Sequence, residues 1–328
     1  MAIGNLIKEN NKQWSCGRVE LQLHNYILRL NGTSIKSAVC MVQSAVSACF
    51  CMWGLERGEQ QATFMEGEQI GRKGIPSLLK SSDGVVGQEE HIASDVTQLI
   101  GWTPLIELKR ITNKEGLDAR IVGKIEVFQP LCSIKDRSAL RSVMIENAEK
   151  RGLITPGVTT LVEYTSVMPD PALGFPGIRD KIEQLKQELP NVHVLDQFTN
   201  KANPDARVLW TRPEIWRDTA GKVDIFVAAS GSGGTVSGVG KYLKMQKPGV
   251  KVICVEPAES PVISGGMVGN KIQGVGAGFV PEVLDTSIID EIVTVTTEDA
   301  MVNAKRLAKE EGLLVGIPSG VNLAACLS

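Results

Sequence analysis

From about residue 95 onward, short apolar runs rich in β-branched residues alternate with longer amphipathic stretches. Such runs are typical of buried strands, and the amphipathic stretches are typical of helices that cover a sheet. The pattern predicts strands at residues 119–127, 159–163, 192–195, 222–228, 250–255 and 313–315, and helices at 136–151, 178–189, 236–245 and 299–311. This alternation predicts an α/β fold with parallel sheets.

The N-terminal part, residues 1–93, lacks this alternation, and residues 56–90 resemble a linker. An uncharged run extends from Ser37 to Leu55. It is long enough to span a membrane, but its serines and small apolar residues argue against a span. A degenerate organelle-targeting segment is an alternative. We favour a poorly ordered extension without a function of its own.

Composition narrows the possible functions. The chain has 328 residues, of which 43% are hydrophobic and 22% charged, as expected for about two globular domains. A net charge of −2 and an aromatic content of 5% argue against nucleic acid as the main partner. Seven scattered cysteines and three distant histidines suggest no metal site, and the scattered cysteines favour a reducing compartment.

A glycine-rich segment, Ser230-Gly-Ser-Gly-Gly-Thr235, separates a predicted strand from a predicted helix. Glycines let the backbone turn sharply and approach an anion closely, and the helix that follows directs free N–H groups at that anion. The segment therefore predicts a phosphate-binding loop, with a simple tight turn as the alternative. A Walker-type loop is disfavoured because no Gly-Lys-Ser/Thr follows.

Lys135 lies in Ser133-Ile-Lys-Asp-Arg137, directly before the predicted helix at 136–151. The positive end of a helix dipole and partial burial both favour a neutral amine, the form that attacks an aldehyde. Asp136 and Arg137 suit the start of a helix with local ion pairing. The alternative interpretation is a solvated helix face.

Several motifs in order resemble cysteine synthase, the O-acetylserine sulfhydrylase of the β-substituted alanine synthases, with the plant-type enzymes nearest. The resemblance runs from about residue 94 to the end of the sequence. Its main segments are 99–106, 133–137, 152–157, 200–204, 231–235, 255–257, 260–262, 271–274 and 311–316.

This resemblance implies pyridoxal phosphate (PLP) fold type II, similar to the tryptophan synthase β subunit. It implies two α/β domains with parallel sheets: an incomplete N-terminal domain at 94–200 that carries the lysine, and a C-terminal domain at 201–328 that carries the phosphate loop. It implies that Lys135 forms the Schiff base with the cofactor and moves the substrate's α-proton. The implied phosphate-binding residues are Gly231, Ser232, Gly233, Gly234 and Thr235, and Gly274 is implied to contact substrate.

The chain also departs from the family pattern. The family's Thr-Ser-Gly-Asn-Thr-Gly loop binds the substrate carboxylate. Of this motif only Thr165 and Ser166 remain here, and the Gly-Asn-Thr part is absent. The units that should follow this loop are missing, so we expect a weakened N-terminal domain with an open sheet edge. The serine that contacts the pyridine nitrogen corresponds to Pro318, and Ser319 is the candidate substitute. Arg212 replaces a glycine.

The resemblance implies β-replacement on O-acetylserine with sulfide to give cysteine, and cyanide chemistry to give β-cyanoalanine is an alternative. A catalytically impaired, PLP-binding relative and a defective product are the other hypotheses. The resemblance implies a homodimer, whereas the altered carboxylate loop argues against docking of serine acetyltransferase. We expect a cytoplasmic protein, with the chloroplast or mitochondrion as alternatives, and neither a metal nor a membrane as partner.

Overall fold

The computed structural model describes residues 37–42, 92–93, 96–139, 143–163, 174–269 and 272–328. A six-stranded sheet has the order β2-β3-β1-β6-β7-β8, and a second sheet consists of β4 and β5. All pairs of neighbouring strands are parallel except β2 with β3. The strands are β1 (Ser37–Val42), β2 (Leu105–Glu107), β3 (Arg120–Ile125), β4 (Thr160–Glu163), β5 (Val192–Leu195), β6 (Ile225–Ala229), β7 (Lys251–Pro257) and β8 (Glu291–Val295).

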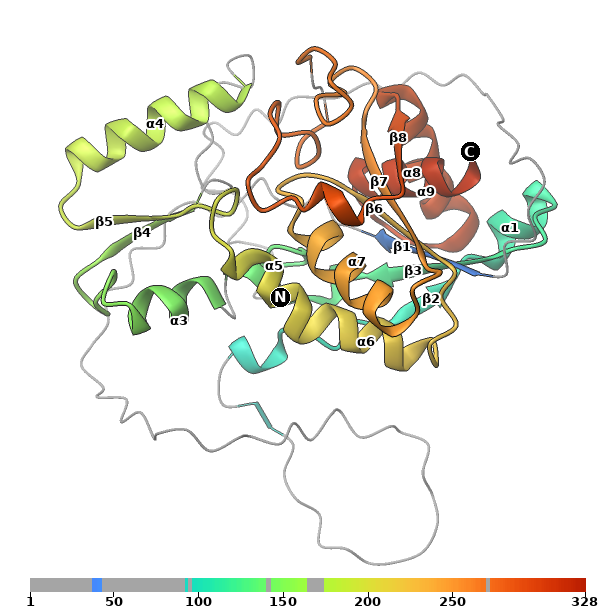
Figure 1. Ribbon diagram of the computed structural model, residues 1–328, viewed down its shortest axis with the longest axis horizontal. Coiled ribbons are helices and arrows are strands. Elements are labelled where there is room, and N and C mark those ends of the chain that lie inside the picture. The colour runs from blue at the N-terminus through green and yellow to red at the C-terminus, as the bar shows by residue number, and fades with distance from the viewer. Residues whose placement is uncertain (1–36, 43–91, 94–95, 140–142, 164–173, 270–271) are drawn as a thin grey trace, which may run out of the picture.

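Helices cover both faces of the larger sheet (Figure 1). Val227 and Ala229 of β6 face a core shared with α1 (Lys109–Glu115), α8 (Thr297–Glu311) and α9 (Ile317–Leu327). Phe226 and Ala228 face the opposite core, shared with α6 (Arg212–Asp218) and α7 (Gly234–Gln246). Burial on both faces explains why these strands have continuous apolar sequences rather than alternating ones.

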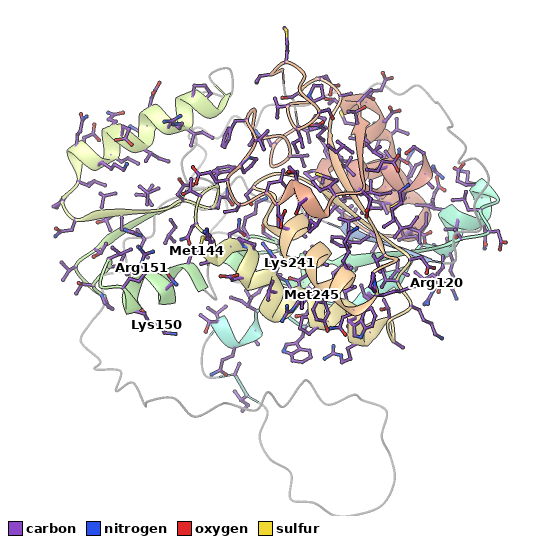
Figure 2. All side chains as sticks on the ribbon, viewed as in Figure 1. Arg120, Met144, Lys150, Arg151, Lys241 and Met245 are labelled. Atoms are coloured by element: carbon purple, nitrogen blue, oxygen red, sulfur yellow. The ribbon has the colours of Figure 1, made fainter. Side chains whose placement is uncertain are left out.

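The outer side of α7 is exposed to solvent. Lys241 and Met245 lie one turn apart on this helix, and both are exposed (Figure 2). The buried side of α7 consists of Val236, Val239 and Leu243, which repeat at the spacing of an amphipathic helix.

The smaller sheet lies between helices. Val162 and Val194 contact Ile182 of α4 (Gly174–Glu188), whereas Leu195 contacts Met144 of α3 (Val143–Lys150) and Ala202 of α5 (Ala202–Ala206). Within the described ranges, β4 and β5 pair only with each other. Leu161 of β4 is 39% exposed, so part of the apolar face of this sheet is open to solvent.

Most predicted elements form at the expected places, and the helix predicted at 136–151 forms as α2 (Asp136–Ala139) and α3 on either side of residues outside the described ranges. The strand predicted at 313–315 is wrong, because these residues connect α8 to α9 without pairing. Leu313 reaches the core while Leu314 is 83% exposed. A run of three apolar residues predicts partial burial but provides no neighbouring strand.

The predicted extension at residues 1–93 contains β1, which pairs with β3 on one side and β6 on the other. The structure also groups strands across the predicted domain boundary at residue 200, because β2 and β3 join β6–β8 in one sheet. The remaining boundaries of the two-domain division stay predictions. In the described part of the chain, no helix is long and apolar enough to cross a membrane.

Arg212 lies at the position where the family has glycine. Its side chain packs over the aromatic ring of Tyr242. Its guanidinium carbon lies 4.5 Å from the centroid of the Tyr242 ring on α7. A guanidinium over an aromatic face is a favourable arrangement. This contact joins α6 to α7, although Arg212 Nε is buried without a hydrogen-bond partner.

Candidate active site

The glycine turn, Ser230–Thr235, connects β6 to α7. Gly233 is the N-cap of α7 and has a φ of +80°, a conformation that side chains disfavour. A glycine N-cap has no side chain with which to satisfy the first amides of the helix. These amides and the positive end of the helix dipole remain available to an anion.

Gly274 lies between the glycine turn and Lys135. A Cβ placed on Gly231 would lie 2.6 Å from the Gly274 carbonyl oxygen, and one placed on Gly274 would lie 3.4 Å from Lys135 Nζ. The Gly276 amide donates to the Ser230 carbonyl at 2.8 Å, which holds this loop against the turn. The structure therefore brings Lys135, Gly274 and the glycine turn together, although 98 residues separate Lys135 from Gly233.

A buried ionic network anchors the segment that follows Lys135. Arg137 is fully buried and donates to both carboxylate oxygens of Glu126 and of Glu214 at 2.7–3.0 Å. Lys124 Nζ lies 2.7 Å from Glu214 Oε2 and donates to the Thr103 carbonyl at 2.6 Å. The Lys-Asp-Arg run is therefore not a solvated helix face.

The charges in this network shift one another's pKa values. Burial would raise the pKa of Glu214, but the hydrogen bonds and charge of Arg137, with Lys124, lower it to about 2. Burial lowers the pKa of Lys124 more than the two glutamates raise it. Burial raises the pKa of Asp136 to about 6, although its carboxylate accepts from the Leu131 amide at 2.7 Å. The hydrogen bonds of Arg137 are to Glu126 and Glu214, which are distant in sequence, rather than to its neighbour Asp136.

Asn203 on α5 contacts the glycine turn, and its sequence position alone predicted no role for it. Its side-chain amide donates to Ser232 Oγ and to the Gln197 carbonyl, both at 2.8 Å. A Cβ on Gly234 would lie 2.6 Å from Asn203 Oδ1. The only sequence signal was its place in a family-like segment, 200–204, which gave it no role.

Of the other predicted site residues, the structure describes Ser319 but not Thr165 or Ser166. Ser319 is buried in the first turn of α9, three residues before Asn322, whose Oδ1 accepts from the Ala229 amide at 2.7 Å. This contact brings the first turns of α9 to the end of β6, beside the glycine turn. A contact between Ser319 and the cofactor ring stays a prediction. Thr165 and Ser166 lie outside the described residues.

The arrangement fits pyridoxal phosphate. A glycine turn before a helix suits its phosphate, and a lysine amine beside Gly274 suits its aldehyde. Residues 173–328 match the family described as "Pyridoxal-phosphate dependent enzyme". The fold and the site thus define a PLP-dependent enzyme of fold type II.

Individual relatives narrow the class. Cysteine synthase 3 of Caenorhabditis elegans is 45% identical over 280 residues, covering 73% of this chain and 82% of the relative. Cysteine synthase A of Escherichia coli K12 is 37% identical over 287 residues, covering 72% and 86%. The solved cysteine synthase of Entamoeba histolytica superposes with a TM-score of 0.65 at 31% identity, covering 75% and 85%. The chain belongs to the cysteine synthase family.

Gly231 provides a test of the close approach between the turn and Gly274. We expect Gly231→Ala to raise the dissociation constant for PLP by about 10-fold or more, because the new methyl group must displace the Gly274 backbone. Equilibrium titration of the apoprotein with PLP measures this constant. Gly249→Ala is the matched control, since no atom lies within 4 Å of its Cβ position. Equal affinities for the two variants would contradict the assignment.

Proposed function

We propose that this chain replaces the acetate group of O-acetylserine with sulfide to form cysteine, using pyridoxal phosphate bound at Lys135. In this reaction the bond between the β-carbon and the acetate oxygen breaks, and a carbon–sulfur bond forms in its place. The main structural support is the proximity of Lys135 Nζ, Gly274 and Gly231. Membership in the cysteine synthase family supports the substrates.

The residues of the site have separate roles in binding the cofactor and in proton transfer. The amides of Gly231–Thr235 and the Ser232 and Thr235 hydroxyls hold the phosphate at the start of α7. Lys135 Nζ would hold the cofactor covalently and would accept the proton of the substrate's α-carbon. Gly274 leaves room beside this amine, because any side chain there would begin 3.4 Å from Nζ. When bound, pyridoxal phosphate withdraws electrons from the amino-acid substrate.

The buried network keeps the amine in place. Arg137, two residues after Lys135, is tied to Glu126 from the segment after β3 and to Glu214 from α6. These bonds fix the start of α2 relative to two other elements. Small displacements of a catalytic group are costly for rate, so this anchoring supports the role of Lys135.

Visible absorption tests the proposal. The purified protein with PLP should show the band of a lysine-bound cofactor, and O-acetylserine should shift it. Sulfide should then restore the original band as cysteine forms. A band that ignores O-acetylserine would show a PLP-binding relative without this activity. The absence of any band would contradict the proposal altogether.

A further inference from the structure

A single helical face contacts both halves of the site. The helix α5 continues directly into a π-helical turn, η5 (Arg207–Thr211), with right-handed helical backbone at the junction. Asn203 and Arg207 are four residues apart and therefore lie on the same side of this segment. Both are buried, with exposed fractions of 2% and 3%.

The two side chains reach different segments. Asn203 donates to Ser232 Oγ in the glycine turn. Arg207 Nη2 donates at 2.9 Å to the carbonyl of Ile134, the residue before Lys135. The helical segment therefore contacts the phosphate side of the site through one residue and the lysine side through the other.

The segment is held closely against α7. A Cβ on Gly238 would lie 2.5 Å from the Pro204 carbonyl oxygen and 2.7 Å from Arg207 Cβ. Together with the contact of Gly234 with Asn203, this leaves α5 little freedom to slide along α7. Such close contact gives the segment a defined position from which to act on both sides.

Burial of Arg207 is costly. Burial lowers the pKa of its guanidinium to about 10, against the raising effect of Glu126, Glu214 and Asp136. A buried cation requires hydrogen bonds and opposite charges to be tolerated. An apolar side chain would fill the same space without this cost, so the bond to the Ile134 carbonyl is the feature that an apolar residue would not reproduce.

We propose that Asn203 and Arg207 are positioning residues that fix the separation between the phosphate site and the Lys135 amine, Asn203 by orienting Ser232 and Arg207 by holding the Ile134 carbonyl. The inference rests on the proposed function only insofar as PLP binds at Lys135. The cofactor carries its aldehyde and its phosphate arm on one aromatic ring, so a fixed separation would allow both groups to be engaged together.

The experiment separates the two roles. Phosphate-side affinity is measured by titrating PLP into Lys135→Ala protein, which cannot attach the cofactor covalently at that position. Attachment is measured in Lys135 protein at saturating PLP, by borohydride trapping followed by mass spectrometry of the Lys135 peptide. Neither measurement requires turnover, and circular dichroism confirms that each variant is folded.

Asn203→Asp keeps the size of the side chain but places a carboxylate beside Ser232. We expect it to weaken PLP binding about 10-fold in the Lys135→Ala protein, with little effect on pyridoxal, which lacks the phosphate. Arg207→Met should leave that affinity within about 2-fold but slow trapping at Lys135 about 10-fold. Arg207→Lys should recover part of the trapping rate, since it keeps a cationic donor.

Different outcomes have different consequences. If both variants lower only the urea midpoint, with affinity and trapping unchanged, the residues are merely structural and the inference is wrong. If Arg207→Met impairs phosphate-side affinity as much as Asn203→Asp, the division of roles is wrong. If trapping persists on Lys135→Ala protein, the proposed function fails first, whatever the Asn203 and Arg207 variants do.

Discussion

Replacing Arg137 with methionine should lower the free energy of unfolding by about 3–5 kcal/mol. The change removes five hydrogen bonds to Glu126, Glu214 and Thr103 and leaves buried carboxylates with fewer partners. The expected loss is a large part of the roughly 5–15 kcal/mol by which domains are stable. Urea denaturation followed by circular dichroism measures it.

Arg120→Met is the matched control. Arg120 pairs with Glu107 at 3.0 Å, but its side chain is 50% exposed at the edge of the molecule (Figure 2). Exposed ion pairs contribute about 1 kcal/mol or less. Similar losses for the two variants would show that the buried network is not what holds the start of α2.

Acid titration checks the same network. Because the folded-state pKa of Glu214 is about 2 instead of 4.5, its carboxylate contributes stability above pH 4.5 that is lost as the pH falls toward 2. Arg137 is the main opponent of burial at this carboxylate. The Arg137→Met variant should therefore lose less stability over this interval than the unmodified protein. A steeper loss in the variant would contradict the assigned cause.

Replacing Lys135 with alanine should reduce cysteine formation by about 1,000-fold or more, because one amine provides both covalent attachment and proton transfer. The glycine turn remains intact in this variant, so PLP should still bind through its phosphate, although more weakly. Initial rates with O-acetylserine and sulfide, and visible spectra after gel filtration, measure the two effects. The variant should lose the lysine-bound band.

Lys241→Ala provides the comparison for this variant. Lys241 is an exposed lysine on α7, the helix that begins at the glycine turn (Figure 2). Its removal should leave the rate and the band unchanged. If Lys135→Ala retains the band while Lys241→Ala loses it, the lysine has been assigned wrongly.

The sequence could predict the parts of this structure whose causes are local. Strands such as Ile225–Ala229 are continuous apolar runs, and the glycine turn can be recognised from its glycine and serine content. Lys135 was found through its family motif. Asn203 and Arg207 could not be found in this way, because their roles depend on Ser232 and Ile134, which only the folded chain brings near.

The same limit explains the errors. The segment 313–315 has a strand-like composition but no neighbouring strand. Ser37–Val42 has a neighbouring strand on each side, but its own sequence does not predict this pairing. The role of Arg137 was also hidden, since its partners Glu126 and Glu214 lie 11 and 77 residues away.

The position of β1 has a consequence for synthesis on the ribosome. Ala38 pairs with Ile121 and with Ile225, which is about 190 residues later in the chain. The strand is thus made long before one of its two neighbours exists, and loop closure over such distances is slow. Until β6 has been synthesised, β1 lacks one of its two neighbours, and an unpaired strand edge of this kind favours aggregation of a nascent chain.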